Sequence, residues 1–152
     1  MLILAWILGT LNEDAGSFEK IFMIAHYTLG ISVFLMVGFR LLWRFMNITP
    51  EHVVNNKFLI FISNSVFIFF YSLMLIIPLS GYLTMNFKGR NPVFFGYEIP
   101  SLFGYSENWE DIMGEVHELL STVLIVLIVL HVAAALFHHF IRKDSTLKRI
   151  LY

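Results

Sequence analysis

The stretch Val116–His139, VHELLSTVLIVLIVLHVAAALFHH, is an apolar, helix-forming run that is long enough to cross a lipid bilayer. It carries His117 and His131, fourteen residues apart, which is about 21 Å along a helix axis at ~1.5 Å per residue. At ~100° per residue the two side chains are only some 40° from the same direction, so they share one helix face. An ionisable side chain within a membrane helix is costly and by default marks a functional site.

The composition is that of a membrane protein. Of the 152 residues, 58% are hydrophobic and 14% charged, which is too apolar for a soluble domain of this length. The net charge of −1 gives no reason to expect a nucleic-acid partner. The absence of cysteine excludes disulfides, iron–sulfur clusters and Cys-ligated zinc.

Hydropathy predicts three membrane-spanning helices, at roughly 18–45, 58–85 and 112–141. Residues 1–11 are also apolar but would reach only about half-way through a ~30 Å core. They form either the core of a signal peptide or half of a transmembrane helix. We expect half a helix, because residues 1–16 contain no Lys or Arg for the positive start of a signal peptide.

The basic residues predict the orientation. Seven lie on one side of the predicted spans and three on the other, which places the first group in the cytoplasm. The cytoplasmic group is Arg40, Arg44, Lys57, Arg142, Lys143, Lys148 and Arg149, and the opposite group is Lys20, Lys88 and Arg90. Residues 87–111 are therefore expected to face the periplasm or its equivalent.

His26 and His117 lie at similar depths below the outer ends of their helices, so they can face each other. A single such histidine often only bonds to a neighbouring helix, and zinc would need further ligands at the same depth. A haem held by imidazoles from two facing helices suits the pattern better. Gly30, one turn from His26, would let a ring or a helix approach closely. Arg40 would meet haem propionates or anchor its helix at the lipid headgroups.

Four blocks of the chain carry a family resemblance: IAHYTLGISVFLMVGFRLLWRF, PLSGYLTMNFKGRNPVFFG, VHELL and LHVAAALFHHFIRKDSTLKRIL. In order and spacing they resemble the bacterial cytochrome b561 family, from about Ile21 to the C-terminus. The resemblance implies an all-α membrane protein, a four-helix transmembrane bundle of the bacterial inner membrane whose first helix is truncated here. It further implies that residues 1–152 form a single transmembrane cytochrome b domain with two b haems.

By the same resemblance, His26 and His117 match the ligand pair of the outer haem, and His131 matches one ligand of the inner haem. The other inner ligand lies early in the first helix in the family, and this sequence lacks it. We expect that the start omits roughly fifteen to twenty residues needed to complete the span. Otherwise the inner haem is five-coordinate, differently ligated or absent. Asn64 and Phe67 stand where some relatives carry His.

The resemblance also implies electron transfer across the membrane, from a periplasmic one-electron donor such as superoxide to ubiquinone or another membrane quinone. His138 would border the quinone site, or only anchor the helix at the interface. Steering of superoxide would require Lys20, Lys88 and Arg90 to cluster at the haem edge. The alternative is a haem-b anchor subunit that relays electrons for a docked partner. A haem-free transporter is disfavoured, because the sequence shows no internal repeat.

Overall fold

The computed structural model describes residues 1–11, 16–47 and 57–141. Within these ranges the chain is almost entirely helical. The elements are α1 (Leu2–Thr10), a 3-10 turn (Gly16–Phe18), α2 (Glu19–Met46), α3 (Lys57–Phe87), β1 (Val93–Phe94), β2 (Tyr97–Glu98) and α4 (Glu107–Phe140).

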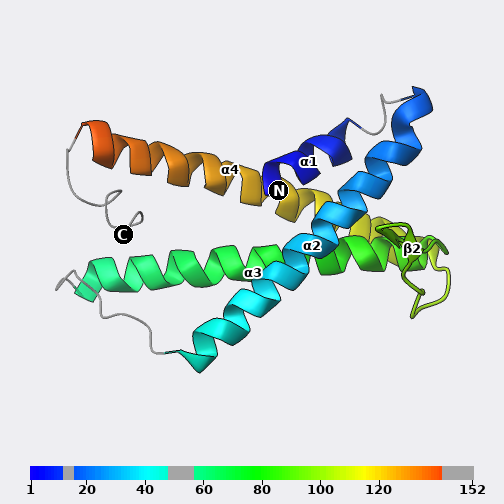
Figure 1. Cartoon of the computed structure of the whole chain (residues 1–152), viewed down its shortest axis with the longest axis horizontal. Helices are drawn as coiled ribbons and strands as arrows, with labels where there is room; N and C mark the ends of the chain where they lie inside the picture. Colours follow the sequence, from blue (N-terminus) through cyan, green and yellow to red (C-terminus); the bar gives the residue numbers. More distant parts are fainter. Residues whose placement is uncertain (12–15, 48–56, 142–152) are drawn as a thin grey trace.

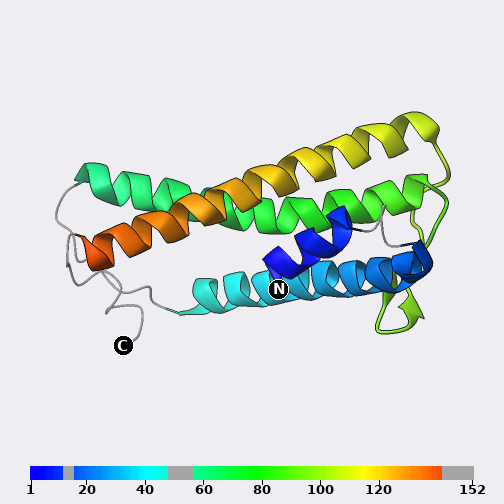
Figure 2. The same ribbon diagram turned by 90° about the horizontal axis from the view of Figure 1, so that it is seen from above.

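Of the three long helices, α4 packs along α3, and α2 packs against α3 (Figure 2). α2 crosses α3 obliquely near the middle of both helices, and the short α1 packs against α2 (Figure 1). We call the end of the bundle that carries residues 88–106 the outer end, and the opposite end the inner end. Towards the inner end α2 and α4 diverge from each other (Figure 1).

In the described part of the chain, three helices are long and apolar enough to cross a membrane, as the hydropathy predicted. Few described side chains are buried, among them Val33, Leu73 and Leu124, whereas large apolar residues such as Phe39 and Phe69 are exposed. Such an apolar exterior suits lipid, because only a hydrocarbon solvent leaves this surface without cost. α1 has nine residues, about 13 Å of helix, so a fourth span stays a prediction, as does the single domain.

The observed boundaries lie within two residues of the predicted ones except at the start of α4. That helix begins at Glu107 rather than near residue 112, because hydropathy detects only the part of a helix that lies in lipid. Glu107 and Glu110 occupy the first turn, where carboxylates interact favourably with the helix dipole. In α3 the helix continues through Pro78, as expected for a membrane helix whose neighbours compensate the missing N–H.

Residues 88–106 form an ordered cap on the outer end. Its two-residue turn, Phe95 and Gly96, has positive φ values of 47° and 89°, as a type I′ hairpin requires. Asn86, which is fully buried at the end of α3, anchors the rest of the cap. Its side-chain oxygen accepts hydrogen bonds from the backbone N–H groups of Leu102 (2.6 Å) and Phe103 (3.4 Å).

Candidate functional site: two facing histidines

The structure brings His26 of α2 and His117 of α4 together. Their ring centroids are 5.9 Å apart, and the ring planes lie at 77° to each other. Both side chains are partly buried. The two imidazoles therefore form the centre of the candidate site.

Each imidazole is held by a main-chain carbonyl of a third or fourth helix. His26 Nδ1 lies 2.8 Å from the Ala5 oxygen of α1, and His117 Nδ1 lies 2.9 Å from the Ile77 oxygen of α3. A carbonyl oxygen can only accept, so the proton of each ring is on Nδ1. In the neutral form of each imidazole, Nε2 then has a lone pair for a metal ion.

Cavities surround the pair. One of about 60 Å³ is lined by His26, His117 and apolar side chains such as Val33 and Leu124. A second, of about 480 Å³, extends from the same two rings towards Thr10 of α1. The surroundings are apolar on one side of the rings and more open on the other.

These features fit a haem between the two histidines. Two imidazoles on opposite sides of one metal ion, with bonds of about 2.0 Å, have ring centroids roughly 6 Å apart. An imidazole ligand typically donates its other N–H to a carbonyl or carboxylate, which orients the ring. Metal held by protein side chains alone is a poorer fit, since the described residues contain no group of three or more His, Asp or Glu that could hold an ion.

The other residues singled out in the sequence lie in different places. Gly30 lines two cavities beside the histidine pair, and a β-carbon there would meet nothing within 4 Å, so this glycine leaves space rather than permitting tight packing. His131 is exposed on α4, with its ring 5.6 Å from that of Phe70. Arg40 is exposed on α2, about 21 Å along the helix from His26. The side chain of His138 lies outside the described residues.

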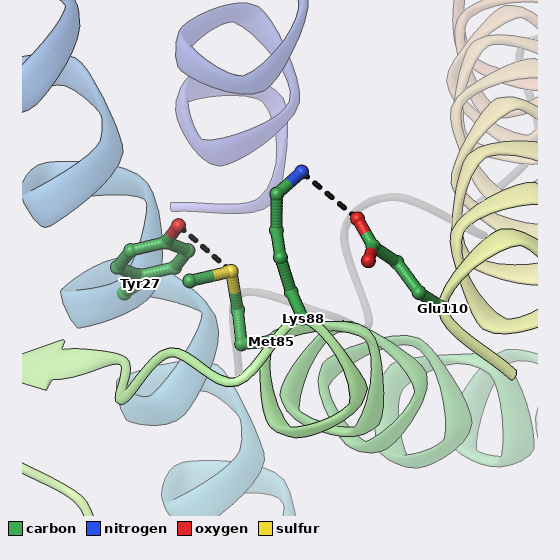
Figure 3. Close-up of polar contacts among 4 residues, drawn as sticks. All are labelled: Tyr27, Met85, Lys88 and Glu110. Atoms are coloured by element: carbon green, nitrogen blue, oxygen red, sulfur yellow. Dashed lines mark hydrogen bonds and ion pairs between the residues drawn. The ribbon is translucent and has the colours of Figure 1, made fainter. Parts of the chain in front are cut away.

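The three outer cations line a single cavity of about 430 Å³. Lys20 of α2 shares it with Lys88 and Arg90, which follow α3. Glu19 lines it too, and Lys88 pairs with Glu110 of α4 at 3.1 Å (Figure 3). Counting these charges, three positive and two negative, leaves one net positive charge at the cavity.

Tyr27 connects this cavity with the histidine pair. Its ring lies 6.0 Å from that of His26, and its hydroxyl donates to Met85 Sδ at 3.1 Å (Figure 3). Tyr27 and Met85 both line the cation cavity. The Tyr27 side chain therefore lies between the cation cavity and the His26 ring.

At the inner end, a groove of about 670 Å³ opens between α2 and α3. Polar side chains line it, including Arg44, Asn64 and Tyr71. The Arg44 guanidinium lies over the Phe67 ring, 4.0 Å from its centroid, a cation–π contact. The groove thus combines hydrogen-bonding groups with an apolar wall at the inner end.

Sequence reasoning did not find the groups that hold the imidazoles. Two are backbone oxygens, of Ala5 and Ile77, which no residue type encodes. Two are glycines, Gly9 and Gly81, whose main chain lies against the rings. In the sequence each glycine lies four residues after the residue whose carbonyl accepts the hydrogen bond, and this spacing is too common to be diagnostic.

Comparisons with known proteins point to one family. The family model of prokaryotic cytochrome b561 matches residues 1–152. Cytochrome b561 homolog 2 of Escherichia coli (strain K12) is 31% identical over 83% of this chain and 68% of its own. Cytochrome b561 homolog 1 of the same organism is 28% identical over 83% and 72%. A probable superoxide oxidase CybB of Yersinia pestis is 26% identical over 99% and 87%.

Proposed function

Since the chain belongs to the prokaryotic cytochrome b561 family, and is thereby a haem-binding membrane protein of electron transport, we propose a specific role for it. It is a b-type cytochrome of the bacterial inner membrane that transfers electrons from a one-electron donor at the outer end to a membrane quinone. The observation that carries the proposal is the facing of His26 and His117 with both Nδ1 atoms bonded to carbonyls.

His26 and His117 are the proposed axial ligands of the outer haem, which supplies the one-electron chemistry when bound. The chain's own groups hold the two imidazoles in position and keep water from one side of them. Gly30 leaves space beside His26. His131 is the proposed ligand of a second, inner haem, and Arg40 is a proposed partner for haem propionates.

The test is a haem count. Purified protein is examined by reduced-minus-oxidised visible spectra, and haem per chain is compared with that of His26→Ala and His117→Ala. We expect each substitution to remove the outer haem. The control is Lys57→Ala, which removes an exposed side chain at the inner end of α3. Retention of all haem in both histidine variants would refute the ligand assignment.

For the donor, the cation cavity supports superoxide. A small anion is drawn to positive charge in a partly enclosed site, and this cavity has one net positive charge and reaches His26 through Tyr27. The relative named as a probable superoxide oxidase is consistent with this donor. Charge reversal of Lys88 and Arg90 tests it, and an unchanged reaction rate with superoxide would refute it.

For the acceptor, two inner-end locations can be distinguished by mutation. His138 would supply protons to a reduced quinone, whereas the groove offers Arg44, Asn64 and Tyr71 as hydrogen-bonding groups for quinone oxygens. Quinone reduction is compared in His138→Ala and Tyr71→Phe proteins. Loss in the first alone supports the His138 site, loss in the second alone supports the groove, and parental rates in both refute both locations.

A second candidate is a haem-b anchor subunit. The first turns of α4 expose carboxylates, including Glu107, Asp111 and Glu115, which suit docking of a cationic redox partner. Purification from native membranes separates the two roles. A catalytic protein that co-purifies supports the subunit, and full activity of the isolated chain supports the enzyme.

A further inference from the structure

The main chains of α1 and α3 approach the two imidazoles in the same way. His26 Nδ1 bonds to the carbonyl of Ala5, four residues before Gly9, and His117 Nδ1 bonds to that of Ile77, four residues before Gly81. In an α-helix the N–H of residue i donates to the carbonyl of residue i−4. Each carbonyl is therefore shared between an imidazole and the N–H of a glycine one turn later, and that of Ile77 also accepts a hydrogen bond from the Ser80 hydroxyl at 2.8 Å.

A β-carbon at either glycine would press on the neighbouring imidazole. A β-carbon on Gly9 would lie 3.0 Å from His26 Cε1 and 3.1 Å from its Nδ1. On Gly81 it would lie 2.9 Å from His117 Cε1 and 3.0 Å from its Nδ1. These distances are shorter than side-chain carbons normally adopt, so an alanine would push each ring away from its carbonyl.

We propose that Gly9 and Gly81 are positioning residues, which let each axial imidazole lie against a helix backbone and donate its Nδ1 proton to a carbonyl. This inference rests on the proposed ligand role of His26 and His117. A hydrogen bond donated by Nδ1, the ring nitrogen that does not bind the metal, makes the imidazole a stronger electron donor to the metal. Loss of this hydrogen bond typically weakens metal binding by about 10–100-fold. A weaker electron donor also stabilises the oxidised iron less relative to the reduced iron, so the midpoint potential rises.

The experiment compares Gly9→Ala and Gly81→Ala with Gly38→Ala. Gly38 lies in α2, and a β-carbon there meets nothing within 4 Å. Alanine is the better helix former at all three positions, so a defect in the first two is not a loss of helix propensity. We measure haem affinity by titration of apoprotein in detergent and the midpoint potential by redox titration.

We expect about 10–100-fold weaker haem binding and a raised potential in Gly9→Ala and Gly81→Ala, with parental values in Gly38→Ala. Parental affinity and potential in both variants would overturn the inference. It would leave the proposed function intact if His26→Ala and His117→Ala still lose the haem. If the histidine variants keep all haem, the ligand assignment itself is wrong.

A variant that does not accumulate is judged in haem-depleted cells, by immunodetection of the apoprotein. Without haem the imidazoles can rotate away from the added methyl group, so positioning predicts parental accumulation there. Failure to accumulate even without haem would overturn the inference, because the glycine would then serve helix packing instead.

Discussion

Reversing two charges at the outer cavity tests the proposed anionic donor. Lys88→Glu/Arg90→Glu changes the charge at this cavity from one net positive to three net negative, a change of four units. At roughly 10 Å in water, two unit charges interact by about 0.4 kcal/mol, so an approaching anion loses about 1.7 kcal/mol. Since ~1.4 kcal/mol is a factor of ten, the rate should fall roughly 15-fold at low ionic strength.

The predicted loss of rate should also depend on the salt concentration. At an ionic strength of ~0.15 M the Debye length is about 8 Å, which leaves roughly a third of the interaction and only about a twofold loss of rate. The assay mixes superoxide with the oxidised protein in nanodiscs and follows haem reduction by visible absorbance at several salt concentrations.

Two controls identify the cause. Lys57→Glu changes the charge by two units at the inner end of α3 and should keep the parental rate. An uncharged reductant should reduce the parent and the double variant equally fast. An equal loss with the uncharged reductant, or a loss that does not depend on salt, would refute electrostatic attraction of the donor.

Three further predictions follow from the fold and the proposed second haem. Asn86→Ala leaves the Leu102 N–H without its acceptor, which costs about 1–3 kcal/mol, so hydrogen exchange of that amide should accelerate by ~5–150-fold; unchanged exchange would contradict the anchoring role. Gly96→Val forces a β-branched residue to φ 89° at a cost of about 1–2 kcal/mol, and proteolysis of the cap should be faster than in Gly104→Val, whose added side chain begins in open space. His131→Ala should reduce two b haems per chain to one while the spectrum of the outer haem persists, and an unchanged haem count would exclude His131 as a ligand.

Much of the fold could be predicted because the hydrocarbon core of a membrane offers the backbone no hydrogen-bond partners. Every backbone group in lipid must bond within its own helix, so apolar length alone located α2, α3 and α4 to within a few residues. The predicted start of α4 was wrong because the helix begins with a polar turn at Glu107, where hydropathy gives no signal. Asn86 was missed for a different reason, since its importance depends on a loop that folds back onto α3.

The site could be predicted only as far as side chains define it. Helical periodicity and equal depth were enough to pair His26 with His117. They could not show the tilt of α2 against α4, which separates the inner ends of the two helices (Figure 1) and leaves His131 beside Phe70. The clustering of Lys20 with Lys88 and Arg90 also depends on tertiary structure, because Lys20 lies more than sixty positions before the other two.

The two backbone acceptors have a consequence for how such a protein can diverge. A hydrogen bond that ends on the oxygen of Ala5 or Ile77 survives any change of side chain that keeps the helix in place. Selection on the electronic properties of the site would then act on helix geometry, and residues 5 and 77 could drift between apolar types. Two descendants of one ancestor could therefore share the same environment around both imidazoles and yet have no residue in common at the positions that supply it.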